Sequence, residues 1–158
     1  MAVFTGVVTD QALEKFARAL AGDPGGSPMS LLNGATFKFG EGGWINPGPG
    51  KVPRVPDPTL TDVDAIARPF LYPADSRYVF TKTFPAPDVF WEAPSVARCR
   101  LFLDFGEAND DGFGNSPEFW EVGIFDTTGM MVAYFTMPVQ VKTPIVQIEN
   151  VGRIIFAR

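Results

Sequence analysis

Hydrophobic and polar residues alternate along several short stretches of the chain, and this two-residue period is typical of strands that bury one face. The clearest stretch is 97–105, in which every second residue from Ala97 to Phe105 is apolar or cysteine. The pattern therefore places Cys99 on a core-facing side, as an unreactive thiol. Alternation and short apolar runs predict further strands at 33–39, 76–83, 119–125, 130–137 and 145–156.

Two connections between these strands have recognisable loop chemistry. Residues 126–129 read Asp-Thr-Thr-Gly, which predicts a hairpin turn with Gly129 in the left-handed backbone region. Residues 84–95 contain three prolines and are predicted to be a loop. Its aromatic pair, Phe90 and Trp91, is interpreted either as a plug of the core or as an interface anchor.

Two other segments have apolar residues three and four positions apart, which predicts helices. The first is 8–21, with Thr9 or Asp10 as the N-cap. We expect its apolar face to pack on the sheet; this face holds Leu13, Phe16, Ala17 and Leu20. The second is 59–67. The predicted fold is therefore α+β, with an N-terminal helix and a short second helix packed on a twisted, mostly antiparallel β-sheet or small sandwich.

The segment 40–58 differs from the rest of the chain, because it has five glycines and five prolines in 19 residues. Irregular segments of this length are usually functional or disordered. One interpretation is a flexible surface loop. The other is a long, extended arm that lies on a neighbouring subunit, with Trp44, Ile45, Val52 and Val55 as its anchors. Prolines favour the arm, since they stiffen it and lower the entropic cost of ordering it.

Length and composition limit the classes of function. The 158 residues fit a single domain, 1–158, and the net charge of −5 gives no reason to expect nucleic acid or a membrane as a partner. The absence of histidine excludes Ser-His-Asp and Cys-His catalysis and most catalytic zinc sites. The N-terminus lacks the basic region and apolar core of a signal peptide, so we expect synthesis in a cytoplasm without export by that route.

One acidic stretch has the spacing of a calcium loop. Glu107, Asn109, Asp111 and Glu118 fall on positions 1, 3, 5 and 12 of the EF-hand pattern, and Gly112 falls on position 6. The predicted flanking elements are strands, whereas an EF-hand has helices. A calcium ion that orders the loop is therefore one hypothesis, and a charged loop that simply joins two strands is the other. No other cofactor is expected.

Glu121 is a second candidate because it lies inside an apolar strand. In the alternating pattern it shares a face with Phe119 and Phe125, and a buried carboxylate needs a polar partner. The partners considered are Arg98, Arg100 and Arg153. A structural Glu–Arg pair that fixes the sheet is favoured over a catalytic role.

Several stretches together resemble the tail-collar and tail-fibre N-terminal attachment domains of tailed phages. The segment from 8 to 21 and the strand ending in Gly-Glu-Gly-Gly at 40–43 are similar to the opening of that family, where a helix leads to a strand ending in Gly-Asp/Glu-Gly. Residues 118–126 resemble its strand in which Glu, Gly and Asp are set among apolar residues, followed by Gly129 and the apolar run 131–134. Residues 142–156 resemble the approach to its last strand.

The resemblance implies a structural, non-enzymatic protein of the phage tail. Such a protein belongs to the baseplate or tail tip, where it connects tail subunits or attaches tail fibres. Glu121, Gly123 and Gly129 would then be structural residues. The implied partners are other tail and baseplate proteins and the tail fibre, with multiple copies in a symmetric assembly. The implied location is the virion, after assembly in the host cytoplasm.

Apolar side chains in loops are the residues we expect at such an interface. They are Trp44, Ile45, Val52 and Val55 of the arm, together with Phe113. The alternative function is a carbohydrate- or receptor-binding β module on the tail, in which Phe90 and Trp91 would stack on a sugar beside the acidic loop. A third class, an enzyme that cleaves cell-wall sugars with paired carboxylates, has no support in the spacing of the acidic residues.

Overall fold

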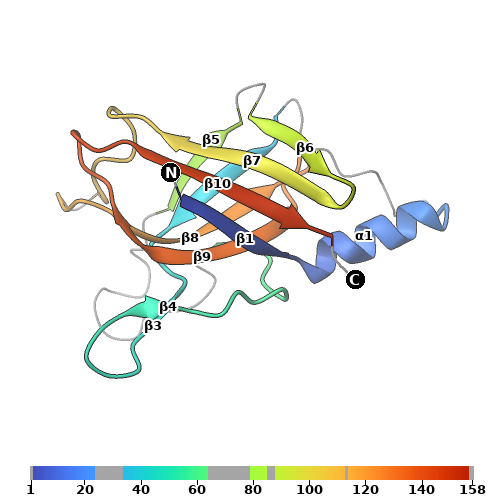
Figure 1. The fold of residues 1–158 in the computed structure, drawn as a ribbon, viewed down its shortest axis with the longest axis horizontal. Helices are drawn as coiled ribbons and strands as arrows, with labels where there is room; N and C mark the ends of the chain where they lie inside the picture. Colours follow the sequence, from blue (N-terminus) through green and yellow to red (C-terminus); the bar gives the residue numbers. More distant parts are fainter. Residues whose placement is uncertain (1, 24–33, 64–78, 85–87, 113, 157–158) are drawn as a thin grey trace.

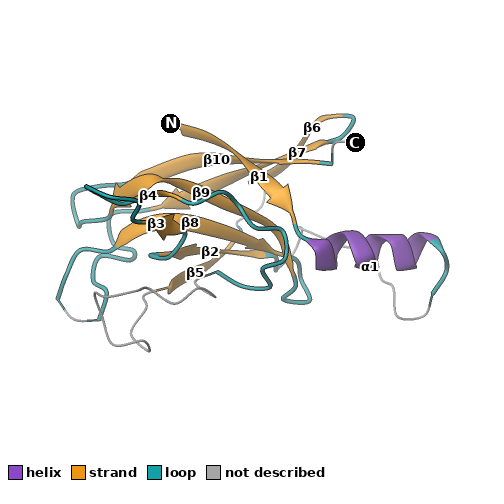
Figure 2. Ribbon diagram, turned by 90° about the horizontal axis from the view of Figure 1, so that it is seen from below, coloured by secondary structure: helices purple, strands orange, loops and turns teal. Residues whose placement is uncertain are grey.

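The computed structural model describes residues 2–23, 34–63, 79–84, 88–112 and 114–156. In these residues the chain forms one strongly curled, eight-stranded sheet in the shape of a half-barrel, with a single helix projecting from one end (Figures 1 and 2). The predicted α+β architecture is therefore wrong. The molecule is mostly β, and the helix does not cover a face of the sheet.

The order of strands across the sheet differs from their order along the chain: β5-β2-β8-β9-β1-β10-β7-β6. The elements are β1 (Ala2–Val8), α1 (Asp10–Leu20), β2 (Thr36–Gly40), β3 (Trp44–Ile45), β4 (Val52–Pro53), β5 (Val79–Thr83), β6 (Val89–Ala93), β7 (Val96–Leu103), β8 (Glu118–Phe125), β9 (Met131–Val141) and β10 (Ile148–Ile155). Among the described residues, β3 and β4 pair only with each other, as a separate two-stranded sheet.

The first strand, β1, holds the two halves of the sheet together. Ala2–Gly6 run parallel to β10, and Val7 and Val8 then pair antiparallel with β9. This strand was not predicted from the sequence. The partner of β1 is the last strand of the chain, and the two run parallel. Parallel strands cannot be joined by a tight turn, so no turn sequence indicates this pairing. The sheet is consequently mixed, and it is not a sandwich of two sheets.

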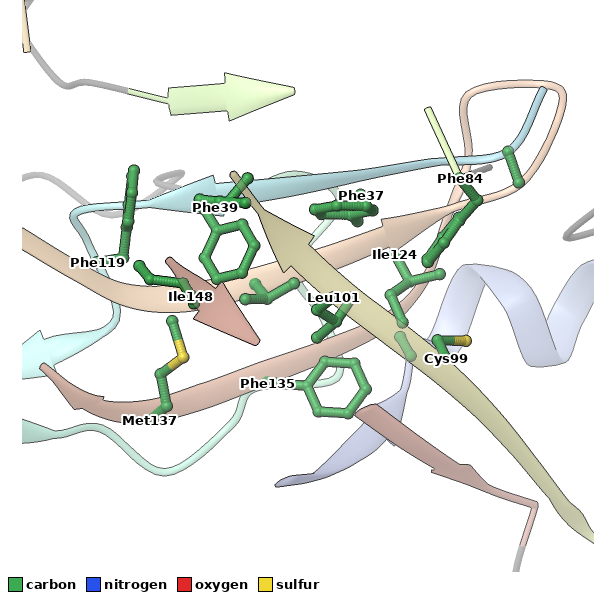
Figure 3. Packing of buried hydrophobic residues seen from close by; sticks show 14 of the residues in the cluster. Phe37, Phe39, Phe84, Cys99, Leu101, Phe119, Ile124, Phe135, Met137 and Ile148 are labelled. Atoms are coloured by element: carbon green, nitrogen blue, oxygen red, sulfur yellow. The ribbon is translucent and has the colours of Figure 1, made fainter. Parts of the chain in front are cut away.

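The core fills the inside of the curl with aromatic and aliphatic side chains (Figure 3). Phe37 packs against Phe39 and Phe84, with ring centroids 5.7 and 4.9 Å apart. Cys99 is fully buried in this cluster, as predicted, and burial raises the pKa of its thiol to about 12. A thiol with such a pKa is protonated and unreactive at neutral pH.

The helix prediction was right about the start of α1 and wrong about its packing. The Thr9 side chain caps the helix by accepting a hydrogen bond from the Ala12 N–H. The predicted apolar face does not lie on the sheet, since Leu13, Phe16 and Leu20 are 49%, 51% and 74% exposed. The inside of the curl is already filled by side chains of the strands, so the helix runs outward past the end of the sheet.

Other predicted elements differ locally from the structure. The predicted loop 84–95 contains β6, which forms an edge hairpin with β7. Within the predicted helix 59–67, residues 59–63 form turns, in which the Thr59 N–H donates to Asp57 Oδ1 at 2.9 Å; residues 64–67 lie outside the described residues. The strands predicted at 119–125, 130–137 and 145–156 are confirmed as β8, β9 and β10, with shifted ends.

Candidate functional site

The most distinctive local structure is the contact between the Gly-rich turn 40–43 and β8. Gly40 pairs with Glu121 in the sheet, and the Glu121 side chain is almost fully buried over the turn. A Cβ atom added to Gly40 would lie 2.6 Å from Glu121 Oε1, and one added to Gly43 would lie 2.6 Å from Glu121 Cβ. Only glycine leaves room for the glutamate at both positions.

The structure gives the buried carboxylate a tyrosine partner. The Tyr134 hydroxyl, on the neighbouring strand β9, donates a hydrogen bond to Glu121 Oε2. Arg100 and Arg153, two of the arginines considered as partners, form ion pairs with Glu149 and Glu92 at 2.8 and 2.7 Å. The predicted hairpin at 126–129 already pairs these two strands, but Tyr134 was not foreseen as the partner, because its proximity to Glu121 depends on the register of β8 and β9, which shifts twice along the pair.

The alternating pattern also misplaced one neighbour of Glu121. The β8–β9 register shifts between Phe119 and Glu121. Phe119 packs in the core cluster inside the curl, whereas Phe125 packs with Tyr134 in a second cluster. An irregularity of this kind changes the side on which a residue lies, so a strict two-residue period fails at that point.

The segment 40–58, which we call the ribbon, is fixed along the sheet by backbone contacts. The Arg54 N–H donates to the Gly43 carbonyl at 2.8 Å, and the Thr136 hydroxyl of β9 donates to the Arg54 carbonyl. At its far end the Pro58 carbonyl accepts from the Asp10 N–H at 2.9 Å. These contacts hold the ribbon on its own sheet, and its contact with a neighbouring subunit stays a prediction.

Apolar side chains of the ribbon remain on the surface. Ile45 and Val52 face each other across the β3–β4 pair and are 49% and 40% exposed, and Val55 is 83% exposed. We call these three residues the ribbon patch. Trp44 is half-buried beneath Lys51, whose Nζ lies 4.8 Å from the centre of the indole ring. Of the other predicted interface residues, Phe113 lies outside the described residues.

The proposed calcium ligands make separate contacts in the structure. Glu107 Oε2 accepts from Lys82 Nζ at 2.6 Å, and Asn109 Oδ1 accepts from Lys142 Nζ at 2.7 Å. The remaining ligands, Asp111 and Glu118, accept from Asn115 and Lys51, both at 3.1 Å. In the described part of the chain, no group of three or more carboxylates or thiols is arranged to hold a metal ion. Calcium binding stays an untested prediction.

Lys142 is a buried cation that sequence reasoning missed. Besides Asn109, its Nζ donates to the Thr143 carbonyl at 3.0 Å. Burial lowers the pKa of this amine, while the nearby carboxylates of Glu107 and Asp104 oppose that shift. The amine therefore joins the 104–111 loop to the end of β9, in the same region where calcium was expected to order the loop.

The turn between β8 and β9 is built around Asp126, and Gly129 adopts the predicted left-handed conformation, with φ of +84°. Asp126 Oδ1 accepts from the N–H groups of Thr128 and Met130 at 2.9 and 3.1 Å, and Oδ2 accepts from Lys15 Nζ of α1 at 2.8 Å. Burial raises the pKa of Asp126, but these hydrogen bonds outweigh it, so the pKa lies below its ordinary value of 3.8.

Asp126→Asn should lower the free energy of unfolding at neutral pH by about 2 kcal/mol, because it weakens charge-assisted hydrogen bonds of a buried group. A carboxylate with a lowered folded-state pKa stabilises the protein above its unfolded pKa, and this contribution disappears as the pH falls through the folded value. Urea unfolding from neutral pH down to about pH 3 should therefore show a shallower acid loss in the variant. Parallel curves for the two proteins would contradict this role of Asp126.

Comparisons with known proteins give no relative for the chain. No family model matches it, and no curated protein or solved structure matches it significantly. Among the described residues, no helix has the length and apolar character needed to cross a membrane.

Proposed function

We propose that this chain is a structural, non-enzymatic virion protein of a phage tail, part of the baseplate or tail tip, which connects tail subunits or attaches tail fibres. One observation carries the proposal. Two of the stretches on which the resemblance to phage attachment domains depends, 40–43 and 118–126, are far apart in sequence but meet in the fold. The glutamate of the second stretch occupies the space that the glycines of the first leave open.

The burial of Glu121 in this contact favours a structural role over catalysis. Glu121 is about 1% exposed and is held by Tyr134, so its carboxylate does not face dissolved substrate. The buried Glu121 side chain fixes the 40–43 turn, with which the ribbon begins. The ribbon then presents its apolar patch from a rigid base, which is the arrangement that a docking surface needs.

The proposed partners are other tail or baseplate proteins and the tail fibre, in a symmetric assembly with several copies of the chain. The location would be the virion, after assembly in the host cytoplasm. The test is the native mass of the purified protein, alone and mixed with tail proteins encoded in the same genome. A stoichiometric complex is expected. If the protein forms no complex with any tail protein but binds a glycan in a screen, the carbohydrate-binding alternative replaces this proposal.

Val52→Glu should weaken this complex at least tenfold, because it places a charge in the centre of the ribbon patch; a tenfold loss corresponds to about 1.4 kcal/mol. Val139→Glu is the matched control, since both valines are 40% exposed and Val139 lies on β9, outside the patch. Titration of each variant with the partner measures the effect. Equal affinity of the two variants would show that the ribbon is not the docking surface.

A further inference from the structure

The side chain of Lys142 is buried without a close counter-ion. It is 0% exposed, and among the described residues no carboxylate lies within the 4.0 Å of an ion pair with its Nζ. Its hydrogen bonds go to two neutral oxygens, Asn109 Oδ1 at 2.7 Å and the Thr143 carbonyl at 3.0 Å. A buried charge is costly unless a counter-ion pairs with it, so these surroundings disfavour the ammonium form of Lys142.

We propose that Lys142 and Asn109 join in an intramolecular isopeptide bond, formed by the folded chain itself. Lys142 Nζ attacks Asn109 Cγ, the Cγ–Nδ2 bond breaks, and the product is a secondary amide between the two side chains. The lysine starts as an ammonium group, and the nitrogen of the asparagine leaves as an ammonium ion. Atoms, electrons and charge therefore balance without any further reactant.

The two reacting groups are already close. Because Cγ is bonded to Oδ1, the hydrogen bond of 2.7 Å places Lys142 Nζ within about 4 Å of Asn109 Cγ. Reacting atoms in near-attack arrangements are about 3–3.5 Å apart, so a movement of about 1 Å or less brings the amine to the carbonyl carbon. Both groups belong to one folded chain, so the reaction has the high effective concentration of an intramolecular step.

The carboxamide of Asn109 is held at both of its polar atoms. Nδ2 donates to the Phe105 carbonyl at 2.5 Å, while Oδ1 accepts from Lys142. The preceding residue, Ala108, has a φ of +52°, which is unfavourable for a residue with a Cβ. Backbone strain of this kind is frequent at functional sites. The departing nitrogen would leave beside the Phe105 carbonyl, which can accept one of its protons.

Carboxylates near the amine can move the proton during the reaction. Glu107 and Asp104 both act electrostatically on Lys142, and Glu107 has the larger effect. Glu107 Oε2 is anchored by Lys82 Nζ at 2.6 Å and by the Asp104 N–H at 2.8 Å. A positioned carboxylate can take a proton from the attacking amine and give it to the departing nitrogen, directly or through one water.

The isopeptide bond would remove the unpaired charge from the interior. The neutral amide N–H that forms at Lys142 can still donate to the Thr143 carbonyl, while the released ammonium ion enters water. The bond would join positions 33 residues apart and tie the 104–111 loop to the end of β9. Like a disulfide, it would restrict the unfolded chain. This inference goes beyond the proposed function and does not depend on it.

The first test is the intact mass of the purified wild-type chain. Loss of one ammonia should place the mass about 17 Da below the value calculated from the sequence. A succinimide at an asparagine gives the same loss but joins no peptides, so proteolysis must also yield one species that contains both Lys142 and Asn109. An unreduced mass, or a reduced mass without the joined peptides, would overturn the proposal.

The second test compares substitutions of two lysines. Lys142→Arg keeps a positive charge but cannot form the bond, so its mass should equal the calculated value. Lys15→Arg is the matched control, because Lys15 is also a largely buried lysine and its partner is Asp126. This control should show the wild-type loss of mass. Equal losses in the two variants would contradict the bond, and the wild-type mass decides the question even if Lys142→Arg does not fold.

The third test concerns the proton transfer by Glu107. In a cell-free synthesis reaction sampled over time, Glu107→Gln should form the bond at least tenfold more slowly than the wild type. Glu107→Asp should restore part of the rate, because it keeps the carboxylate, whereas a purely structural role would give no such rescue. Equal rates for the wild type and Glu107→Gln would show that Glu107 does not move the proton.

Discussion

Gly43→Ala should lower the free energy of unfolding by about 2–4 kcal/mol, one of the two largest effects expected in this protein. Two costs add at this position. Gly43 has a φ of +78°, which is unfavourable for any residue with a Cβ. The new methyl group would also lie 2.6 Å from Glu121 Cβ and 3.2 Å from the Trp120 carbonyl, where backbone must move to make room. Urea unfolding of the two proteins measures the difference.

Gly129→Ala separates the two costs. Gly129 has nearly the same backbone conformation, with φ of +84°, but no atom lies within 4 Å of the position where its Cβ would be. This variant should therefore lose only about 1 kcal/mol, the cost of the left-handed conformation. If both variants lost the same amount, the contact between the turn and Glu121 would contribute nothing to stability.

Glu121→Ala should cost a similar amount, about 3–4 kcal/mol, because it opens a cavity beneath the 40–43 turn and removes an acceptor of the buried Tyr134 hydroxyl. Tyr134→Phe should cost less, about 1–3 kcal/mol, since it removes one donor from a buried carboxylate and leaves the packing intact. The double variant should lose less than the sum of the two, because the side chains are bonded to each other. Urea unfolding of all four proteins gives this coupling.

Glu149→Ala is the control for removing a carboxylate at the surface. Its ion pair with Arg100 involves side chains that are 43% and 39% exposed, so the loss should stay below about 1 kcal/mol. Glu121→Gln keeps the shape of the side chain and should fall between Glu121→Ala and the wild type. Strict additivity of Glu121→Ala and Tyr134→Phe would show that the bond between them does not stabilise the fold.

These variants also bear on function, because the turn is the base of the ribbon. If the ribbon patch docks a tail protein, Gly43→Ala should weaken that complex even at temperatures where the domain stays folded. Gly129→Ala should leave the complex intact, since its turn lies at the other end of β8. The pair of glycine variants thereby connects the stability of the turn to the binding of the partner.

The parts of the structure that could be predicted from the sequence depend on neighbours a few residues away. Alternation at 97–105 correctly placed Cys99, Leu101 and Leu103 in the core, although Phe105 lies beyond β7 and is 49% exposed. The N-cap was predicted at Thr9 or Asp10 and lies at Thr9, and the left-handed turn at Gly129 was predicted correctly, because these residue types favour such positions. Each of these features requires only a local period or a backbone preference.

The candidate site could not be predicted to the same extent. Its residues were recognised, since Glu121, Gly123 and the 40–43 glycines all stand out in sequence, but their contacts were not. Gly123 is required because a Cβ there would lie 2.7 Å from Val63 and 2.9 Å from the Met131 sulfur. Some of these partners come from segments far apart in the sequence, such as Val63 and Gly123, and the others depend on the exact register of a hairpin; side-chain spacing contains no information about either.

The sequence by itself determined several of the segments that become strands, among them β7, β8 and β9, as well as where the helix begins and the absence of histidine chemistry. Only the tertiary structure decided that β1 joins both halves of one curled sheet, that Tyr134 satisfies the buried Glu121, and that α1 turns its apolar side outward. The physical reason is the range of the interactions. A local pattern fixes the shape of a segment, whereas burial depends on which other segments have already filled the core.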